Sequence, residues 1–197
     1  MERVLLVRHA ESAASLAGVV NGVPGAGVGL SEEGQRQAQA LADVLAPVEV
    51  DLCVVTQFPR TVETADLALA GRGVRRLVVP ELNDPDYGDF EGGSLDVFRE
   101  WAAANTASVR PPGGSESRAE IVARYARGYR RLLSRPEPAV AGFLHSLPIA
   151  YLLSAAEGHH PRAKERLIEY STVLEIDAEG MDRAVSRLEA WAKAPTW

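Results

Sequence analysis

Cysteine is nearly absent from the chain, since Cys53 is the only one in 197 residues. An internal disulfide therefore cannot form, and a metal cluster held by several cysteines is excluded. Cys53 lies within the apolar run 52–55, and free cysteines in such runs are usually buried. We expect this thiol to be an inert core residue.

Long hydrophobic runs are also missing. The first apolar run, residues 4–7, ends at Arg8 and is too short for a signal peptide or a membrane span. We therefore expect a cytoplasmic protein. Lysine is scarce too, with two lysines beside nineteen arginines, and the forked guanidinium group of arginine matches the geometry of phosphate oxygens.

Positive charge is in deficit, because 21 Lys and Arg side chains accompany 27 Asp and Glu side chains, for a net charge of −6. An acidic surface disfavours nonspecific binding, so neither nucleic acid nor a membrane is an expected partner. The 46% of hydrophobic residues can fill a core, and the balanced 24% of charged residues excludes a disordered chain. We expect one domain over residues 1–197; the oligomeric state is not predicted.

Apolar runs alternate with segments of helical periodicity along the chain. The runs predict strands at about 4–7, 52–55, 77–79 and 140–144, and the periodic segments predict helices at about 31–47, 60–70, 95–105, 116–134 and 148–157. Residues 172–176 and 184–188, joined by 177–180, predict a terminal hairpin. This order indicates an α/β fold, a three-layer α/β/α sandwich whose mainly parallel sheet has an antiparallel edge.

Basic and imidazole side chains follow three of the predicted strands. Arg8 and His9 follow the first strand, Arg60 follows the second, and His145 follows the fourth. The loops at the carboxyl ends of parallel strands form the ligand crevice of such sheets, so these groups converge if the strands are neighbours. Two guanidinium groups bind a phosphate dianion, and an imidazole beside them can attack phosphorus.

Six ordered segments carry a family resemblance. The first is Leu6-Val7-Arg8-His9-Ala10-Glu11-Ser12, followed by Leu30-Ser31-Glu32-Glu33-Gly34, Arg60-Thr61-Val62-Glu63-Thr64-Ala65, Leu82-Asn83-Asp84 with Gly88-Asp89-Phe90-Glu91-Gly92, Pro112-Gly113-Gly114-Ser115-Glu116-Ser117, and His145. Together they cover about residues 3–157, and the chain thereby resembles the histidine phosphatase (phosphoglycerate mutase-like) superfamily. Six segments in order are a specific signal, whereas a lone Arg-His pair is a weak one.

The resemblance implies a role for each matching position. His9 would be the nucleophile that becomes phosphohistidine, Arg8 and Arg60 would clamp the phosphoryl group, and His145 would hydrogen-bond it. Asp84 occupies the position of the family's general acid, where the family pattern has a glutamate.

Several positions near the implied site stay open. Glu81 and Asp86 are substitutes for Asp84 if its carboxylate does not reach the phosphoryl group. Ser15, by its spacing, and Asn21, by its residue type, are candidates for a substrate-binding polar residue after the signature. Ser146, which replaces a glycine that often follows the second histidine, is a further substrate-binding candidate.

The implied function is hydrolysis of a small phosphorylated substrate without metal or cofactor, by a histidine acid phosphatase-type phosphoric monoester hydrolase acting through His9. Two alternatives stay open. One is a phosphoglycerate-mutase-type phosphotransferase; the other is a non-catalytic phospholigand-binding protein, which the changes at Ala10, Asp84 and Ser146 motivate. The consecutive pair His159 and His160 could suggest a metal site, but a third ligand is missing, and a solvated turn is the better interpretation.

Substrate choice is expected to depend on two segments that would overhang the crevice, residues 18–29 and 95–110. A small cap is expected at about 94–115, with Trp101 as part of the lid or of the core. Arg99, Arg110 and Trp101 are candidates to contact a second anion or a ring of the substrate.

Overall fold

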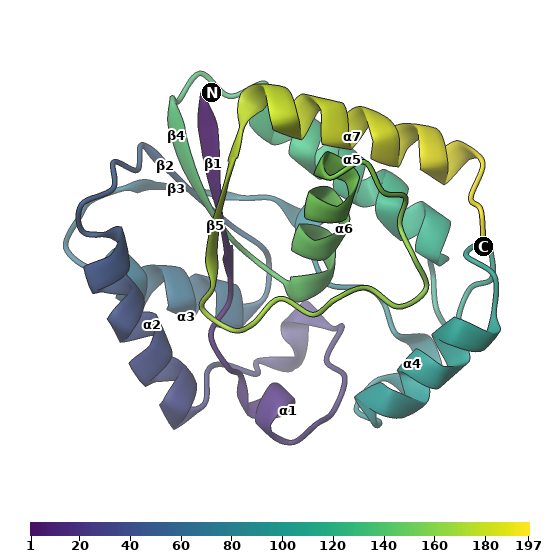
Figure 1. The fold of residues 1–197 in the computed structure, drawn as a ribbon. Helices are drawn as coiled ribbons and strands as arrows, with labels where there is room; N and C mark the ends of the chain where they lie inside the picture. Colours follow the sequence, from purple (N-terminus) through teal and green to yellow (C-terminus); the bar gives the residue numbers. More distant parts are fainter.

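A five-stranded sheet runs through the computed structural model, which describes residues 1–197 (Figure 1). The strands are ordered β3-β2-β4-β1-β5 across the sheet. Their bounds are Arg3–Arg8 for β1, Leu52–Val55 for β2, Arg75–Val78 for β3, Ala139–Leu144 for β4 and Val173–Asp177 for β5. The first four strands run parallel, whereas β5 pairs antiparallel with β1. The predicted parallel sheet with an antiparallel edge is confirmed.

Helices occupy both faces of this sheet. Their bounds are Ala13–Leu16 for α1, Glu32–Leu45 for α2, Pro59–Ala68 for α3, Leu95–Ala104 for α4, Arg118–Leu133 for α5, Ser146–Ala156 for α6 and Ala178–Lys193 for α7. Short 3₁₀ turns lie between these elements, at Pro24–Ala26, Pro80–Leu82 and Gly88–Phe90. Ser31 caps α2, since its Oγ accepts a hydrogen bond from the Gly34 N–H at 2.9 Å.

The side chains of β1 alternate between two apolar clusters because successive residues of a strand point to opposite faces. Leu5 and Val7 belong to the cluster formed with α2 and α3, while Val4 and Leu6 belong to the larger one formed with α5, α6 and α7. Figure 1 shows the resulting layers, with α2 and α3 on one side of the sheet and α5, α6 and α7 on the other. Cys53 is buried in the first cluster, as expected, and burial raises its pKa to about 11.

The predicted terminal hairpin is wrong, because residues 184–188 lie in α7 rather than in a strand. Asp177 starts this helix: its Oδ1 accepts a hydrogen bond from the Gly180 N–H at 2.6 Å. Over the whole segment the buried side chains recur with the helical period, at Met181, Ala184, Val185, Leu188 and Trp191. The five-residue window 184–188 was too short to show this period.

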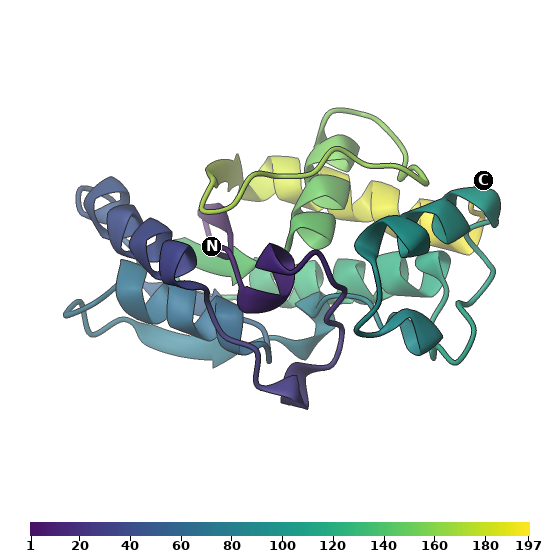
Figure 2. The ribbon, with the colours of Figure 1, turned by 90° about the horizontal axis from the view of Figure 1, so that it is seen from below.

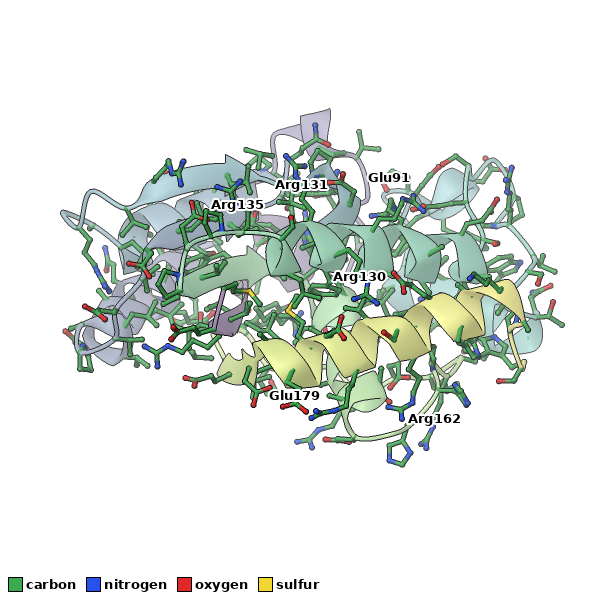
Figure 3. All side chains as sticks on the ribbon, turned by 90° about the horizontal axis from the view of Figure 1, so that it is seen from above. Glu91, Arg130, Arg131, Arg135, Arg162 and Glu179 are labelled. Atoms are coloured by element: carbon green, nitrogen blue, oxygen red, sulfur yellow. The ribbon has the colours of Figure 1, made fainter.

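Helix α7 packs along α5 on the outer side of the molecule, as Figure 3 shows. Arg130 of α5 joins the two helices, because its guanidinium donates to Glu189 at 2.9 Å and to the Ser186 hydroxyl at 2.8 Å. The rings of Trp191 and Trp197 lie 4.8 Å apart beyond this contact and hold the C-terminus against the helix. None of the helices is long and apolar enough to cross a membrane.

The helices α1 and α4 lie beyond the carboxyl ends of the parallel strands, which Figure 2 shows from below. The backbone of residues 18–20 hydrogen-bonds to that of residues 92–95, so the two segments that follow the first strand and precede α4 form one unit. Phe98 and Ala102 of α4 pack on Val20 within this unit. Trp101 packs on Phe98 and Phe90 and does not reach the cavity described next.

Candidate active site

Three neighbouring strands bring the predicted charged groups to one place. In the sheet β4 lies between β1 and β2, so the segments that leave these three strands start side by side. Arg8 ends β1, His145 directly follows β4, and Arg60 lies in the first turn of α3 after β2. The condition on which the sequence prediction depended, that these strands are neighbours, is therefore met.

A cavity of about 580 Å³ opens above these strand ends. Seven of the eight predicted site residues line it: Arg8, His9, Ser15, Asn21, Arg60, Asp84 and Ser146. The eighth, His145, is fully buried directly behind it, with its ring 5.3 Å from the ring of His9. The structure thus gathers all eight residues around one site.

His9 is held in one tautomer by the backbone. Its Nδ1 lies 2.7 Å from the Ala10 carbonyl oxygen, which can only accept, so Nδ1 carries the proton and Nε2 keeps its lone pair. The Ala10 N–H in turn donates to the Thr64 hydroxyl at 3.0 Å, which fixes this turn. Burial, with the nearby positive charge of Arg60, holds the pKa of His9 well below its ordinary value. The imidazole is a neutral base that can act as a nucleophile.

Arg60 is the buried cation of the site, with 3% of its surface exposed. Its guanidinium donates to Asp84 Oδ2 at 2.7 Å and to Asn21 Oδ1 at 2.8 Å. It also lies 4.1 Å above the Phe58 ring, which fixes its plane. Because the side chains of Asp84, Asn21 and Phe58 orient it, the guanidinium group of Arg60 is positioned before any ligand binds.

Asp84 joins Arg60 to His145. Its Oδ2 lies 3.2 Å from His145 Nδ1, and His145 Nε2 lies 2.9 Å from the Thr56 hydroxyl on the other side. Burial disfavours the charged carboxylate, but His145 and Arg60 outweigh it, so the pKa of Asp84 lies well below its usual range. For His145 burial dominates and lowers the pKa, although Asp84 opposes the shift. Asp84 is therefore ionised in this arrangement.

Arg8 is oriented by a segment that the sequence did not indicate. Its guanidinium lies 3.7 Å above the Tyr170 ring and donates to the Ile168 carbonyl. The Ile168 N–H donates to the Ser146 hydroxyl at 3.0 Å, so this segment also contacts the start of α6. The loop between α6 and β5 thereby closes one wall of the cavity.

Residues 4–190 match the family model described as histidine phosphatase superfamily (branch 1). The chain belongs to this superfamily. Three of the six segments that indicated the resemblance line the cavity of this histidine phosphatase superfamily member, through Arg8 and His9, Arg60, and Asp84.

Relatives of this member of the superfamily are phosphatases. The acid phosphatase of Mycobacterium tuberculosis is 31% identical over 163 residues, which are 82% of this chain and 72% of that protein. The adenosylcobalamin/alpha-ribazole phosphatase of Salmonella typhimurium is 38% identical over 89 residues, 45% of this chain. That alignment spans 43% of the Salmonella enzyme, less than half of its length.

Solved structures share the fold. The alpha-ribazole phosphatase of Shigella flexneri has a TM-score of 0.75 at 25% identity, covering 89% of this chain and 90% of that one. A mycobacterial glucosyl-3-phosphoglycerate phosphatase in complex with VO3 has a TM-score of 0.73 at 25% identity, covering 89% of this chain and 92% of that one.

In this histidine phosphatase superfamily member, the two alternatives to Asp84 as the general acid lie outside the cavity. Glu81 pairs with Arg131 on the surface, and Asp86 accepts hydrogen bonds from Ser115; neither lines the cavity. Of the three candidates for the acid, Asp84 alone lines the cavity.

Of the two arginines expected to make a second contact with the substrate, only one lines the cavity. Arg99 lines the cavity, whereas Arg110 is paired with Glu120 outside it, so the expectation for Arg110 is wrong. His159 and His160 border a separate surface hollow, and neither belongs to a group of three or more residues that could hold a metal ion.

Sequence reasoning missed the cavity residues Arg118, Lys164, Arg166 and Tyr170. Arg118 directly follows the Pro112–Ser117 segment, so its position next to a motif was an available signal. The other three lie in the loop before β5, where no motif or periodicity marks them.

Proposed function

We propose that the protein hydrolyses phosphomonoesters, without a metal, through a phosphohistidine formed on His9. The observation that carries the proposal is the neutral imidazole of His9, whose free Nε2 lies in a cavity with the guanidinium groups of Arg8 and Arg60. The two arginines neutralise the phosphoryl dianion and the negative charge on its equatorial oxygens. The phosphatase relatives support this reaction type.

The reaction would proceed in two displacements. His9 Nε2 attacks phosphorus, the N–P bond forms, and the bond from phosphorus to the ester oxygen breaks. Asp84 gives its proton to the departing oxygen. Asp84 then takes a proton from a water molecule, whose oxygen attacks phosphorus, breaks the N–P bond and releases inorganic phosphate. His145 Nδ1, which makes no hydrogen bond to the protein, would donate to the phosphoryl group in this scheme.

The ionised Asp84 must gain a proton before it can act as an acid. Binding of a phosphoryl dianion supplies the reason, because it places two negative charges beside the carboxylate and draws the Arg60 fork toward the phosphate oxygens. Both changes raise the pKa of Asp84. The substrate therefore protonates its own general acid, and the carboxyl is ionised again once phosphate has left.

The substrate class we propose is a small phosphomonoester, as for the relatives named as alpha-ribazole and acid phosphatases. An acid phosphatase-type enzyme fits the lowered pKa of His9, because the nucleophile then stays unprotonated in mildly acidic solution. Residues 94–115, which include α4, would act as the cap over the substrate.

The test is release of inorganic phosphate from a panel of phosphomonoesters, with a chelator present, by the wild type, His9→Ala and His160→Ala. We expect the wild type and the exposed-histidine control to be active, and His9→Ala to lose about 10³-fold or more of kcat. Acid-labile phosphate should be trapped on the wild type and not on His9→Ala. Turnover that survives in His9→Ala would refute the mechanism.

The same panel distinguishes the two alternatives. A mutase would move phosphate to a second hydroxyl of the substrate without releasing it, which phosphorus NMR of the reaction mixture detects. A binding protein would bind phosphomonoesters with no trapped phosphate and no turnover. Quantitative release of inorganic phosphate is the outcome we expect.

A further inference from the structure

The cavity contains more positive charge than one phosphoryl group needs. Its cationic lining residues are Arg8, Arg60, Arg99, Arg118, Lys164 and Arg166. Arg8 and Arg60 lie at the strand ends beside His9 and suffice to neutralise a phosphate dianion. Four cations therefore remain in the wall of a cavity that belongs to an acidic chain of net charge −6.

Three of these four cations have no carboxylate partner. Arg99 pairs with Asp96 at 3.2 Å, whereas Arg118, Lys164 and Arg166 make no ion pair within 4.0 Å. Arginines elsewhere on the surface are commonly paired, as Arg110 is with Glu120 and Arg130 with Glu189. The side chains of Arg118, Lys164 and Arg166 are thus free to pair with an anionic ligand.

The acidic lining residues do not cancel this charge. Asp84 is paired with Arg60 and Asp96 with Arg99. Glu165 accepts the Arg162 backbone N–H at 2.9 Å with one of its oxygens, and Glu100 is exposed, as Lys164 and Arg166 also are. Among the remaining lining residues, three cations therefore stand against two carboxylates.

The unpaired cations flank an apolar stretch of wall. Arg118 begins α5 and lies half-buried, 5.7 Å from the Phe98 ring of the cap helix α4. Lys164 and Arg166 come from the loop between α6 and β5. Apolar side chains of α4 and α6 line the same cavity, namely Leu95, Phe98, Ala102, Leu147 and Ala150.

We propose that Arg118, Lys164 and Arg166 form a second anion-binding subsite, which selects phosphomonoesters whose leaving alcohol carries a carboxylate or a second phosphate group. The subsite rests on the proposed function, because the first phosphoryl group must lie at His9. The apolar wall suits the carbon chain or ring that joins the two anionic groups. Arginine and lysine together accept either a planar carboxylate or a phosphate.

The first test measures binding, so it needs no turnover. Alkyl phosphonates of three to eight carbons, ending in a hydroxyl, a carboxylate or a second phosphonate, are titrated into the wild type by calorimetry. We expect one chain length at which an anionic end group tightens binding about tenfold over the hydroxyl. The two anionic end groups distinguish a carboxylate subsite from a phosphate subsite. Equal Kd values for all three end groups at every length would overturn the proposal.

The second test measures kcat/KM for the corresponding ω-carboxyalkyl and ω-hydroxyalkyl phosphates, whose leaving oxygens have similar basicity. We expect Arg118→Gln, Lys164→Gln and Arg166→Gln each to reduce the ratio of the two constants, and the triple variant to bring it to about one. Arg162→Gln is the matched control, since it removes one positive charge from the same loop. Figure 3 labels Arg162 at the outer edge of the molecule, and it does not line the cavity.

The two proposals fail in different ways. If His9 is not the nucleophile, the alkyl phosphates are not turned over through it, but the preference for an anionic end group persists in the phosphonate titrations. If the subsite is wrong, His9-dependent turnover persists and the ratio of the constants equals one in the wild type. The subsite would also be overturned if Arg162→Gln lowered the ratio of the two kcat/KM values as much as Lys164→Gln does. Such a result would indicate a long-range effect of charge.

Discussion

His9 and His145 are two buried imidazoles whose partners give them different chemistry. The Ala10 carbonyl fixes the proton of His9 on Nδ1 and leaves Nε2 free toward the cavity. In His145 the carboxylate of Asp84, 3.2 Å from Nδ1, keeps the proton on Nδ1, so the lone pair lies on Nε2, which is 2.9 Å from the Thr56 hydroxyl. A histidine with no free lone pair cannot attack phosphorus. Hydrogen bonding, rather than residue type, therefore favours His9 as the proposed nucleophile.

At the same scale, Asp84→Asn should separate the two displacements. The amide cannot protonate an alkoxide leaving group, so we expect kcat on alkyl phosphates to fall about 10²–10⁴-fold. With 4-nitrophenyl phosphate, whose leaving group needs no proton, the first displacement should survive. Stopped-flow absorbance should then show a burst of 4-nitrophenol followed by slow turnover.

The control for this variant is Asp86→Asn, a nearby aspartate whose carboxylate binds Ser115 outside the cavity. It should behave as the wild type with both substrates. Equal losses for Asp84→Asn on alkyl and nitrophenyl phosphates, without a burst, would assign the proton transfer to another group.

At the scale of elements, the start of α2 supports the loop that carries His9, the proposed nucleophile. Ser31 donates its backbone N–H to the Glu11 carbonyl at 3.0 Å and its hydroxyl to the Glu11 side chain at 2.6 Å. Gly34 lies so close that a Cβ built on it would come 1.9 Å from the same carbonyl oxygen. The glycine permits the helix to approach residues 9–12 this closely.

Gly34→Ala should therefore damage both the fold and the site. The methyl group must push the Glu11 backbone away, and we expect a loss of about 2–3 kcal/mol in the free energy of unfolding. Because Glu11 is two residues from His9, kcat should fall as well. Urea denaturation and phosphate release measure the two effects.

Gly25→Ala is the matched control, since a Cβ at this glycine meets nothing within 4 Å. Its free energy of unfolding should stay within about 0.5 kcal/mol of the wild type. A Gly34→Ala variant as stable and as active as the Gly25→Ala control would contradict the close contact between α2 and Glu11.

At the scale of the whole molecule, the buried histidines make folding depend on pH. The pKa values of His9 and His145 are lowered below the ordinary 6.5 in the folded chain, mainly by burial. Above pH 6.5 both are neutral in either state and contribute nothing to this dependence. Below it the unfolded chain binds protons that the folded chain does not, so acidification favours unfolding.

We therefore expect the Tm to fall between pH 6.5 and pH 5. Each histidine contributes up to about 1.4 kcal/mol per pH unit in that window. The pKa of Asp84 is also lowered, from an ordinary value of 3.8. Asp84 therefore stabilises the fold fully above about pH 3.8 and loses this effect only at lower pH, outside this window. Scanning calorimetry across the window measures the slope.

His9→Gln should reduce this slope by the contribution of one group, whereas the exposed His160→Gln should keep the slope of the wild type. The comparison uses slopes, so a constant stability change in His9→Gln does not affect it. Identical slopes for all three proteins would show that His9 is protonated to the same extent in the folded and unfolded chains.

The sequence by itself determined the alternation of strands and helices and the order of the motif residues. Short buried strands such as 52–55, and capped helices such as the one that Ser31 starts, are encoded locally, by runs of apolar residues and by one side chain at a helix end. Motif residues such as Arg8 and His9 can also be recognised locally, because they are adjacent in the sequence and belong to one short segment.

The terminal helix was also encoded in the sequence, although a short window hid it. Residues 184–188 fit either period, and only the longer stripe from Met181 to Trp191, with Asp177 as the cap, distinguishes a helix from a strand. That error lay in the length of the window rather than in missing information.

Only the tertiary structure decided which side chains surround the substrate cavity. The contacts of Tyr170 with Arg8, and of Arg60 with Asp84, join residues that no local pattern links. Arg118 and Lys164 line the cavity because α5 begins beside it and the loop before β5 passes along it. Strand order and loop placement follow from packing of the whole chain, which minimises exposed apolar surface over all elements at once. A residue's neighbours across the cavity therefore cannot be determined from its own segment.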